Sequence, residues 1–311
     1  MTMDNPFIAL LVITFGAAIV NGALGYGFSS ITVPLALLFL SNRVLNPALV
    51  FVEVILNAWV MWTNRRSLPA VWRRVLPVVI GLLPGVIGGT MIVSQVSPDW
   101  LKLATYIILL PLIFIQAVGW RRPIRAEKSA GFVFGGALGV LYSVTTISGP
   151  PLAVALTNQG FTKQEFRAAL GMIRLAESSM TAVAYLTAGL FTAESLALVP
   201  SILPSVLIGV PIGAYLIHKV QPEMFRRVCM SFDAWIVSFG ISTLLRELQL
   251  VPGYSAYVVM LAVILFDAWL YRYFAPGSGI PRFRGSEVPP PADDSSGPPE
   301  PAGPRPRSNR R

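Results

Sequence analysis

Hydrophobic residues occur along this chain in long blocks separated by short polar segments. The blocks cover residues 7–40, 44–63, 75–94, 100–119, 130–158, 168–189, 196–217, 227–245 and 254–274. Most blocks are about 20 residues long, which is the length of helix needed to cross a hydrocarbon core about 30 Å thick. The pattern therefore predicts an all-α polytopic membrane protein without a soluble domain between its helices.

Composition supports this fold class and excludes several functions. Hydrophobic residues make up 54% of the chain and charged residues 13%, roughly half the charged fraction of a soluble domain. The net charge of +9 reflects an excess of Lys and Arg, which is usual in the cytoplasmic loops of membrane proteins and does not require a nucleic-acid partner. One cysteine and one histidine are too few for a metal site or a haem site. We therefore expect no metal, no cofactor and no enzymatic activity.

The chain contains an internal repeat. Gly22 and Pro34 match Gly139 and Pro151, and residues 85–98 match residues 209–222. The predicted units are a first transmembrane repeat (1–125), a second transmembrane repeat (126–250), an extra transmembrane helix (251–275) and a disordered cytoplasmic tail (276–311). The tail is rich in Pro, Gly, Ser and Arg and cannot form a packed core.

The distribution of Lys and Arg tests how these blocks cross the membrane. If every block crosses once, the positive charges in the loops divide eight to nine and show no bias. If the first block of each repeat enters and returns as a hairpin, broken near residues 25–30 and 145–150, the division becomes fourteen to three. The minority side then holds only Arg43, Lys102 and Arg246. The second division obeys the positive-inside rule and places the N-terminus outside and the C-terminus in the cytoplasm.

Each repeat then consists of one broken hairpin and three transmembrane helices, so the two repeats have inverted topology. Inverted repeats with broken segments at matching positions are typical of secondary transporters, whose substrate sites lie between the repeats. The hairpins are either re-entrant loops or pairs of short spanning helices. The second hairpin has about 28 residues, or about 42 Å of helix, which favours re-entry.

The two breaks are candidate binding segments because irregular backbone inside a membrane must be buried in protein or line a wet cavity. The first break contains glycines followed by hydroxyl residues, and the second contains hydroxyl residues before two prolines. The candidates are Gly25, Gly27, Ser29, Ser30, Thr32, Thr145, Thr146 and Ser148. Hydroxyls and free N–H groups at a helix start bind anions. The alternative is that these small residues only allow close helix packing.

Ionisable residues inside the apolar blocks are a second set of candidates, since each is costly in the bilayer. Arg174 can bind an oxyanion through its guanidinium, or it can form a structural ion pair. The partner in that pair is either Glu53, which lies at the matching repeat position, or Glu177, three residues later on the same predicted helix. Glu53, Glu177 and Asp233 are candidates for proton coupling or for buried hydrogen bonding. Asn57 is a candidate for lining the site.

Three segments carry a resemblance to a known family. They are GALGYGFSSITVPLALLF (22–39), NPALVFVEVILNAW (46–59) and GALGVLYSVTTISGPPLAVAL (136–156). They resemble the sulfite exporter TauE/SafE family of bacterial membrane permeases, over roughly residues 7–245. Here hydroxyl residues occupy much of the stretch in which that family has consecutive glycines. The resemblance implies transport of small anions such as sulfite or organosulfonates across the bacterial inner membrane.

The sequence therefore predicts a secondary transporter in the bacterial inner (plasma) membrane that moves a small anion, sulfite or an organosulfonate, by alternating access. Its expected partners are the anionic substrate and membrane lipid, and coupling protons and further copies of the chain in a homo-oligomer are candidate partners. Two alternatives are a passive anion channel and a non-catalytic membrane partner of a larger complex.

Overall fold

The computed structural model describes residues 4–118, 128–157, 161–216, 222–251 and 253–273. Every regular element in these ranges is a helix, which confirms the predicted all-α class. Residues 1–270 form one compact unit, and the packing described below belongs to it. Residues 271–311 form a second unit, of which only the last turn of the final helix is described. The predicted tail, residues 276–311, lies outside the described residues.

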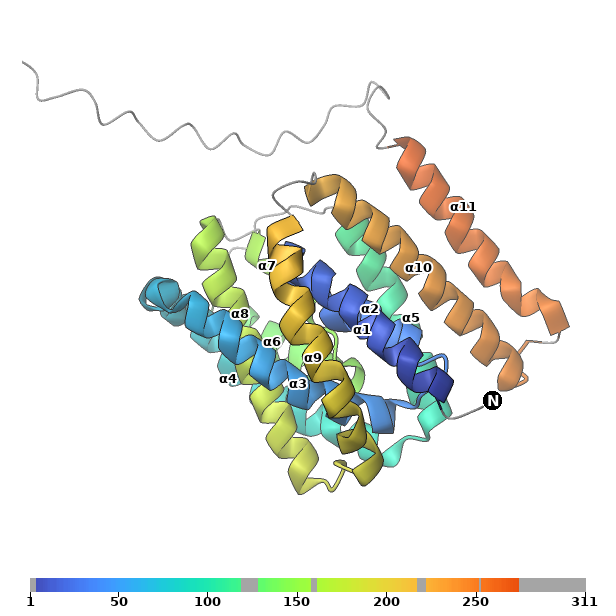
Figure 1. The fold of residues 1–311 in the computed structure, drawn as a ribbon, viewed down its shortest axis with the longest axis horizontal. Helices are drawn as coiled ribbons and strands as arrows, with labels where there is room; N and C mark the ends of the chain where they lie inside the picture. The colour runs from blue at the N-terminus through green and yellow to red at the C-terminus, as the bar shows by residue number, and fades with distance from the viewer. Residues whose placement is uncertain (1–3, 119–127, 158–160, 217–221, 252, 274–311) are drawn as a thin grey trace, which may run out of the picture. The chain divides into compact units, whose positions relative to one another are not determined.

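The helices are arranged in two successive sets of five, followed by one additional helix (Figure 1). The helices are α1 Asp4–Leu24, α2 Phe28–Ala36, α3 Asn42–Thr63, α4 Leu68–Gln95, α5 Pro98–Val118, α6 Lys128–Thr145, α7 Gly149–Thr157, α8 Lys163–Thr187, α9 Ala193–Leu216, α10 Pro222–Glu247 and α11 Val258–Tyr273. Two 3-10 helices, η1 Arg65–Ser67 and η2 Gly253–Tyr257, precede α4 and α11. α1–α5 and α6–α10 both follow the order long, short, long, long, long, and α11 is additional.

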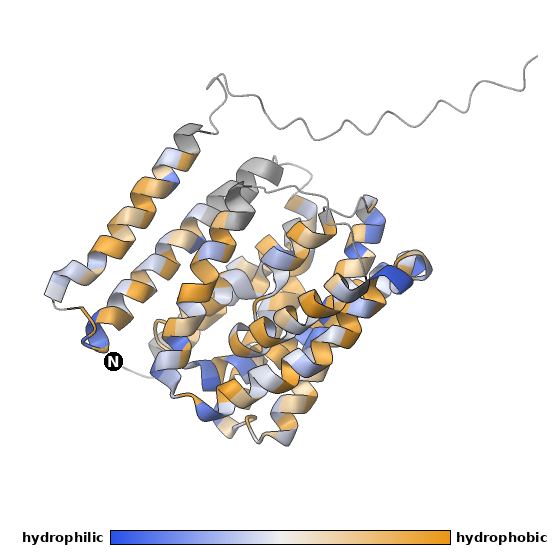
Figure 2. Cartoon of the chain, turned by 180° about the vertical axis from the view of Figure 1, so that it is seen from behind, coloured by the Kyte–Doolittle hydropathy of each residue, from blue (hydrophilic) through white to orange (hydrophobic). Residues whose placement is uncertain are grey.

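Several described helices are long and apolar enough to cross a membrane. The segments are Asn42–Thr63, Arg65–Gln95, Ala193–Leu216 and Gly253–Leu270, and shorter apolar stretches cover Phe7–Ala23 and Ser129–Thr145. Many large apolar side chains are exposed, among them Val133 at 69% and Leu186 at 68%. Hydrophobic positions are spread along all the long helices (Figure 2). Such extensive apolar surface is unfavourable in water and is expected of helices that face lipid. The arrangement agrees with a multi-pass membrane protein.

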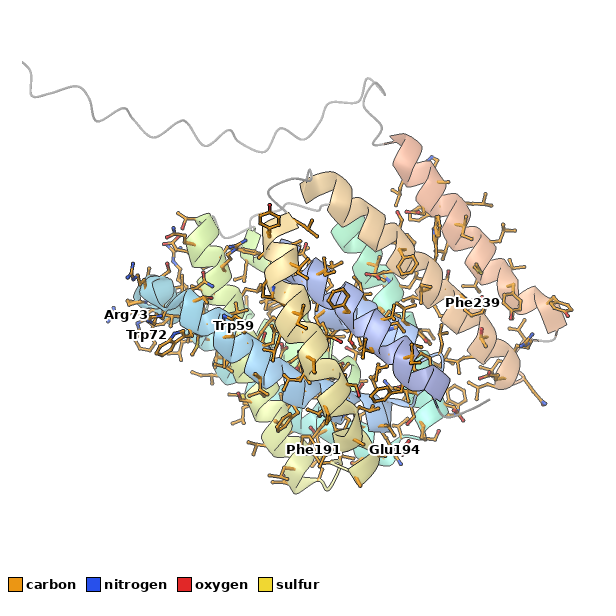
Figure 3. All side chains as sticks on the ribbon, in the orientation of Figure 1. Trp59, Trp72, Arg73, Phe191, Glu194 and Phe239 are labelled. Atoms are coloured by element: carbon orange, nitrogen blue, oxygen red, sulfur yellow. The ribbon has the colours of Figure 1, made fainter. Side chains whose placement is uncertain are left out.

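Basic and aromatic residues gather at one end of α4. Arg65 in η1 lies over the Trp62 ring at 4.5 Å, and Trp72 and Arg73 follow in the first turns of α4 (Figure 3). The opposite end of α4 is held by Arg43, whose guanidinium donates to the carbonyls of residues 93, 94 and 96. Arg73 and Val93 are separated by about 20 residues of helix, or about 30 Å. The distance is the thickness of a hydrocarbon core.

Two pairs of helices approach closely through glycine. On α4, a Cβ atom at Gly85 would lie 2.1 Å from the carbonyl oxygen of Gly136 on α6. On α9, a Cβ atom at Gly213 would lie 1.9 Å from the carbonyl oxygen of Ile19 on α1. Only glycine permits such contact, which is a common mode of helix association in membranes. The first helix of each predicted repeat, α1 or α6, therefore packs against the fourth helix of the other, α9 or α4.

α3 and α8 pack against each other near the centre of the compact unit. Asn57 on α3 contacts Ser178 on α8, whereas Gly171, earlier on α8, lies against Val60, later on α3. The two helices therefore run in opposite directions. α5 packs on α10 in a further pairing of corresponding helices, where a Cβ atom at Gly240 would meet the Tyr106 ring.

Candidate anion-binding site

The structure interrupts the first and sixth helices where the sequence predicts breaks. α1 ends at Leu24 and α2 begins at Phe28, and Gly25 and Gly27 have φ angles of 84° and 106°. These left-handed conformations favour glycine because it lacks Cβ. A Cβ atom at Gly149 would lie 3.3 Å from Cβ of Tyr26, so the two breaks meet inside the protein.

The second break contains a strained residue. Thr146 has a φ angle of 57°, a conformation that is unusual for a β-branched side chain and costs about 1–3 kcal/mol. Its N–H donates to the carbonyl of Tyr142 at 2.6 Å, and its hydroxyl donates to the carbonyl of Thr145 at 2.7 Å. Strain of this kind persists where the surrounding structure enforces it, and it is concentrated at functional sites.

A buried carboxylate joins four helices beside the breaks. Glu53 on α3 accepts hydrogen bonds from Tyr142 on α6 at 2.6 Å, from Arg174 on α8 at 2.9 Å and from Ser29 on α2. Its side chain has 0% exposure, and Arg174 has 4%. We call these four residues the Glu53 cluster.

A second buried carboxylate repeats part of this arrangement in the other half. Glu177 on α8 accepts a hydrogen bond from Ser148, the residue that precedes α7. In both halves a serine at the start of the short helix therefore binds a glutamate on the long helix that follows. The other carboxylate oxygen of Glu177, Oε1, is buried without a hydrogen-bond partner.

Arg174 retains unused hydrogen-bonding capacity. Its Nη2 atom forms the ion pair with Glu53, while its Nε atom is buried without a partner. Asn57 holds the neighbouring backbone by donating to the Arg174 carbonyl at 3.3 Å. A guanidinium presents its donors in a planar fork that matches oxyanions. A buried guanidinium with a free donor, next to hydroxyl groups, is suited to binding a small anion.

The structure brings together six of the predicted residues and separates others. Glu53, Arg174, Glu177, Ser29, Ser148 and Asn57 lie in or beside the cluster. Gly25, Gly27, Thr145 and Thr146 form the breaks, where the two threonine hydroxyls bond to nearby backbone.

Three further candidates make no hydrogen bond or ion pair with the cluster among the described residues. Thr32 is buried on α2 with its hydroxyl unpaired, and Ser30 is partly buried on the same helix. Asp233 is buried on α10, and no hydrogen bond or ion pair among the described residues joins it to the cluster. Tyr142 was not among the predicted residues. A tyrosine in an apolar block close to a break nevertheless indicates a candidate site residue.

Groups of three or more His, Cys, Asp or Glu side chains that could hold a metal ion are absent from the described part of the chain. Arg174 provides the positive charge in the cluster. Its ion pair with Glu53 also decides between two predicted pairings, because Glu177, three residues later on the same helix, makes no ion pair with Arg174 within the described residues.

Together these features define a polytopic helical membrane protein with two broken segments beside a buried ion pair, an arrangement typical of membrane transporters. The sequence profile of the family described as sulfite exporter TauE/SafE matches residues 10–238. The chain belongs to this family, which confirms the resemblance found in its sequence.

One relative supports the assignment. The chain is 24% identical over 192 residues to a protein of Cupriavidus necator named as a probable sulfite/organosulfonate exporter TauE, and the match covers 60% of this chain and 72% of that protein. No solved structure matches the chain.

Proposed function

We propose that this protein transports sulfite or a small organosulfonate across the bacterial inner membrane and binds it at Arg174. The observation that carries the proposal is the buried Arg174 guanidinium, whose Nε donor is unpaired and whose Nη2 shares the Oε1 atom of Glu53 with Ser29 at the start of α2. Family membership and the name of the Cupriavidus necator relative support the class of substrate. Hydroxyls of Ser29, Ser148 and Thr32 are the proposed additional donors.

We infer that the two halves are inverted repeats with the predicted boundaries 1–125 and 126–250, followed by an extra helix over 251–275. The repeated order of helix lengths supports this, as does the opposite direction of the corresponding helices α3 and α8. The separation of Arg43 from the basic end of α4 supports the charge distribution of the hairpin topology. An outside N-terminus and a cytoplasmic C-terminus follow from that topology.

Alternating access is the proposed mechanism, with one repeat rocking against the other. The near-complete burial of Glu53, Glu177 and Arg174 supports it over an open channel, because the site is closed to solvent in this conformation. Glu53 and Glu177 lie beside the site and are the proposed proton carriers if transport is coupled to protons. Asp233 lies apart from the site and is the weaker candidate for that role.

The proposal is tested by exchange of labelled sulfite, sulfoacetate, taurine and acetate in proteoliposomes. Wild-type protein should show saturable exchange of one sulfur anion, and Arg174→Ala should abolish it because the cationic partner is lost. Arg43→Ala is the matched control, since Arg43 binds backbone carbonyls at a helix end outside the cluster. Exchange retained in Arg174→Ala, or absent in correctly inserted wild-type protein, would contradict the proposal.

A further inference from the structure

We propose that the Glu53 carboxylate is a tethered substitute for the transported anion: Arg174 holds it in the empty carrier, and the substrate displaces it. The inference rests on the proposed function and assigns Glu53 a specific role within it. Glu53 would thus be a positioning residue that sets affinity and permits the empty carrier to reorient.

The first argument is the chemistry of the donors around Glu53. A carboxylate and a sulfonate are both oxyanions that accept hydrogen bonds from guanidinium and hydroxyl groups. Glu53 receives one guanidinium donor and two hydroxyl donors, which come from α8, α6 and α2. Ser29 and Tyr142 flank the two breaks, so the carboxylate occupies the position in which a small oxyanion would find its donors.

The second argument is the shortage of positive charge. In the described chain Arg174 makes its ion pair with Glu53 alone. The titratable groups facing Glu53 are Arg174 and Glu177 on α8 and Tyr142 on α6, while α2 contributes the Ser29 hydroxyl. The charged residues of α5 and α9, Asp99, Lys102 and Glu194, lie in the first turns of those helices. Substrate and Glu53 must therefore compete for one guanidinium.

The third argument concerns the empty carrier. A guanidinium left alone in a buried site is strongly unfavourable, and an empty carrier without Glu53 would have to reorient with that charge unpaired. With Glu53 present, the charge is neutralised at 2.9 Å. When substrate displaces Oε1 of the carboxylate from Arg174 and Ser29, Tyr142 still donates to Oε2, which lowers the cost of displacement.

Glu53→Gln tests the proposal because it removes the negative charge at nearly constant volume. Arg174 then has no internal competitor, so the dissociation constant for sulfite and for methanesulfonate should fall by about tenfold. Exchange of anion for anion should persist, because the carrier is always loaded when it reorients. Net efflux into anion-free buffer should fall by about tenfold or more, because the empty carrier then carries an unpaired charge.

Asp267→Asn is the matched control. Asp267 is a carboxylate on α11 with donors from Ser231 and Trp235, away from the cluster. This variant should keep wild-type affinity and net efflux. A second readout covers loss of stability in Glu53→Gln. Sulfite should raise the unfolding temperature of this variant by more than it raises that of the wild type, because stabilisation by a ligand increases with the logarithm of its concentration divided by Kd.

The outcomes separate the two proposals. Wild-type protein without saturable exchange of sulfite or methanesulfonate would refute the proposed function, and this inference with it. Wild-type exchange combined with unchanged or weaker affinity in Glu53→Gln would refute the inference alone. A parallel loss of exchange and net efflux, with no larger stabilisation by sulfite, would also refute it, because it would assign Glu53 a purely structural role.

Discussion

The ion pair between Glu53 and Arg174 allows a quantitative prediction of stability. We consider Glu53→Gln, Arg174→Met and the double variant. Each single change leaves one buried charge without its partner, which typically costs 3–5 kcal/mol of unfolding free energy. The double variant removes both charges and should lose less than the sum of the two single changes.

The size of the difference follows from the geometry. The Nη2 and Oε1 atoms are 2.9 Å apart, so the charge centres lie about 4 Å from each other. Two unit charges at about 4 Å interact by about 4 kcal/mol at an effective dielectric constant of 20. We therefore expect a coupling free energy of about 4 kcal/mol between the two substitutions.

The assay is equilibrium unfolding in mixed detergent micelles, followed by tryptophan fluorescence for all four proteins. Independent sites usually add within about 0.5 kcal/mol. A coupling free energy below that value would show that the two charges do not stabilise each other in the folded protein. The proposed competition between substrate and Glu53 for the Arg174 guanidinium would then have no physical basis.

Three further predictions concern packing, the first break and topology. Gly213→Leu should lower the unfolding free energy by about 1–3 kcal/mol because the new side chain meets the α1 backbone. Gly16→Leu, which has open space around Cβ, should be close to neutral. Thermal unfolding in detergent distinguishes the two variants. Gly27→Ala should cost about 1–2 kcal/mol in the same assay because its φ angle is 106°, and an unchanged midpoint would show that the break relaxes. In a cysteine-free background, Ser97→Cys and Gln164→Cys should react with an impermeant thiol reagent from opposite membrane faces. If every block crossed once, both positions would lie on the same face, so labelling of both from one face would refute the hairpin topology.

Fold class and the positions of the two breaks were predictable because both depend on local properties of the chain. Apolar blocks of membrane-spanning length predict helices, and the glycines around residue 26 predict an interruption. Thr146 shows the limit of this reasoning. Its left-handed backbone is a strained conformation that no local preference favours, and the fold holds it at a fully buried position.

The candidates for the site could be chosen from the sequence alone, since burying an ionisable residue in an apolar block costs free energy whatever its partners are. It left open whether Arg174 pairs with Glu53 or with Glu177, because both pairings agree with the spacing along the chain. Only the tertiary structure decided this, by crossing α3 and α8 so that residues 121 positions apart meet at 2.9 Å. It also brought in Tyr142. Such contacts depend on how helices pack across the whole unit, and helical periodicity alone carries no information about them.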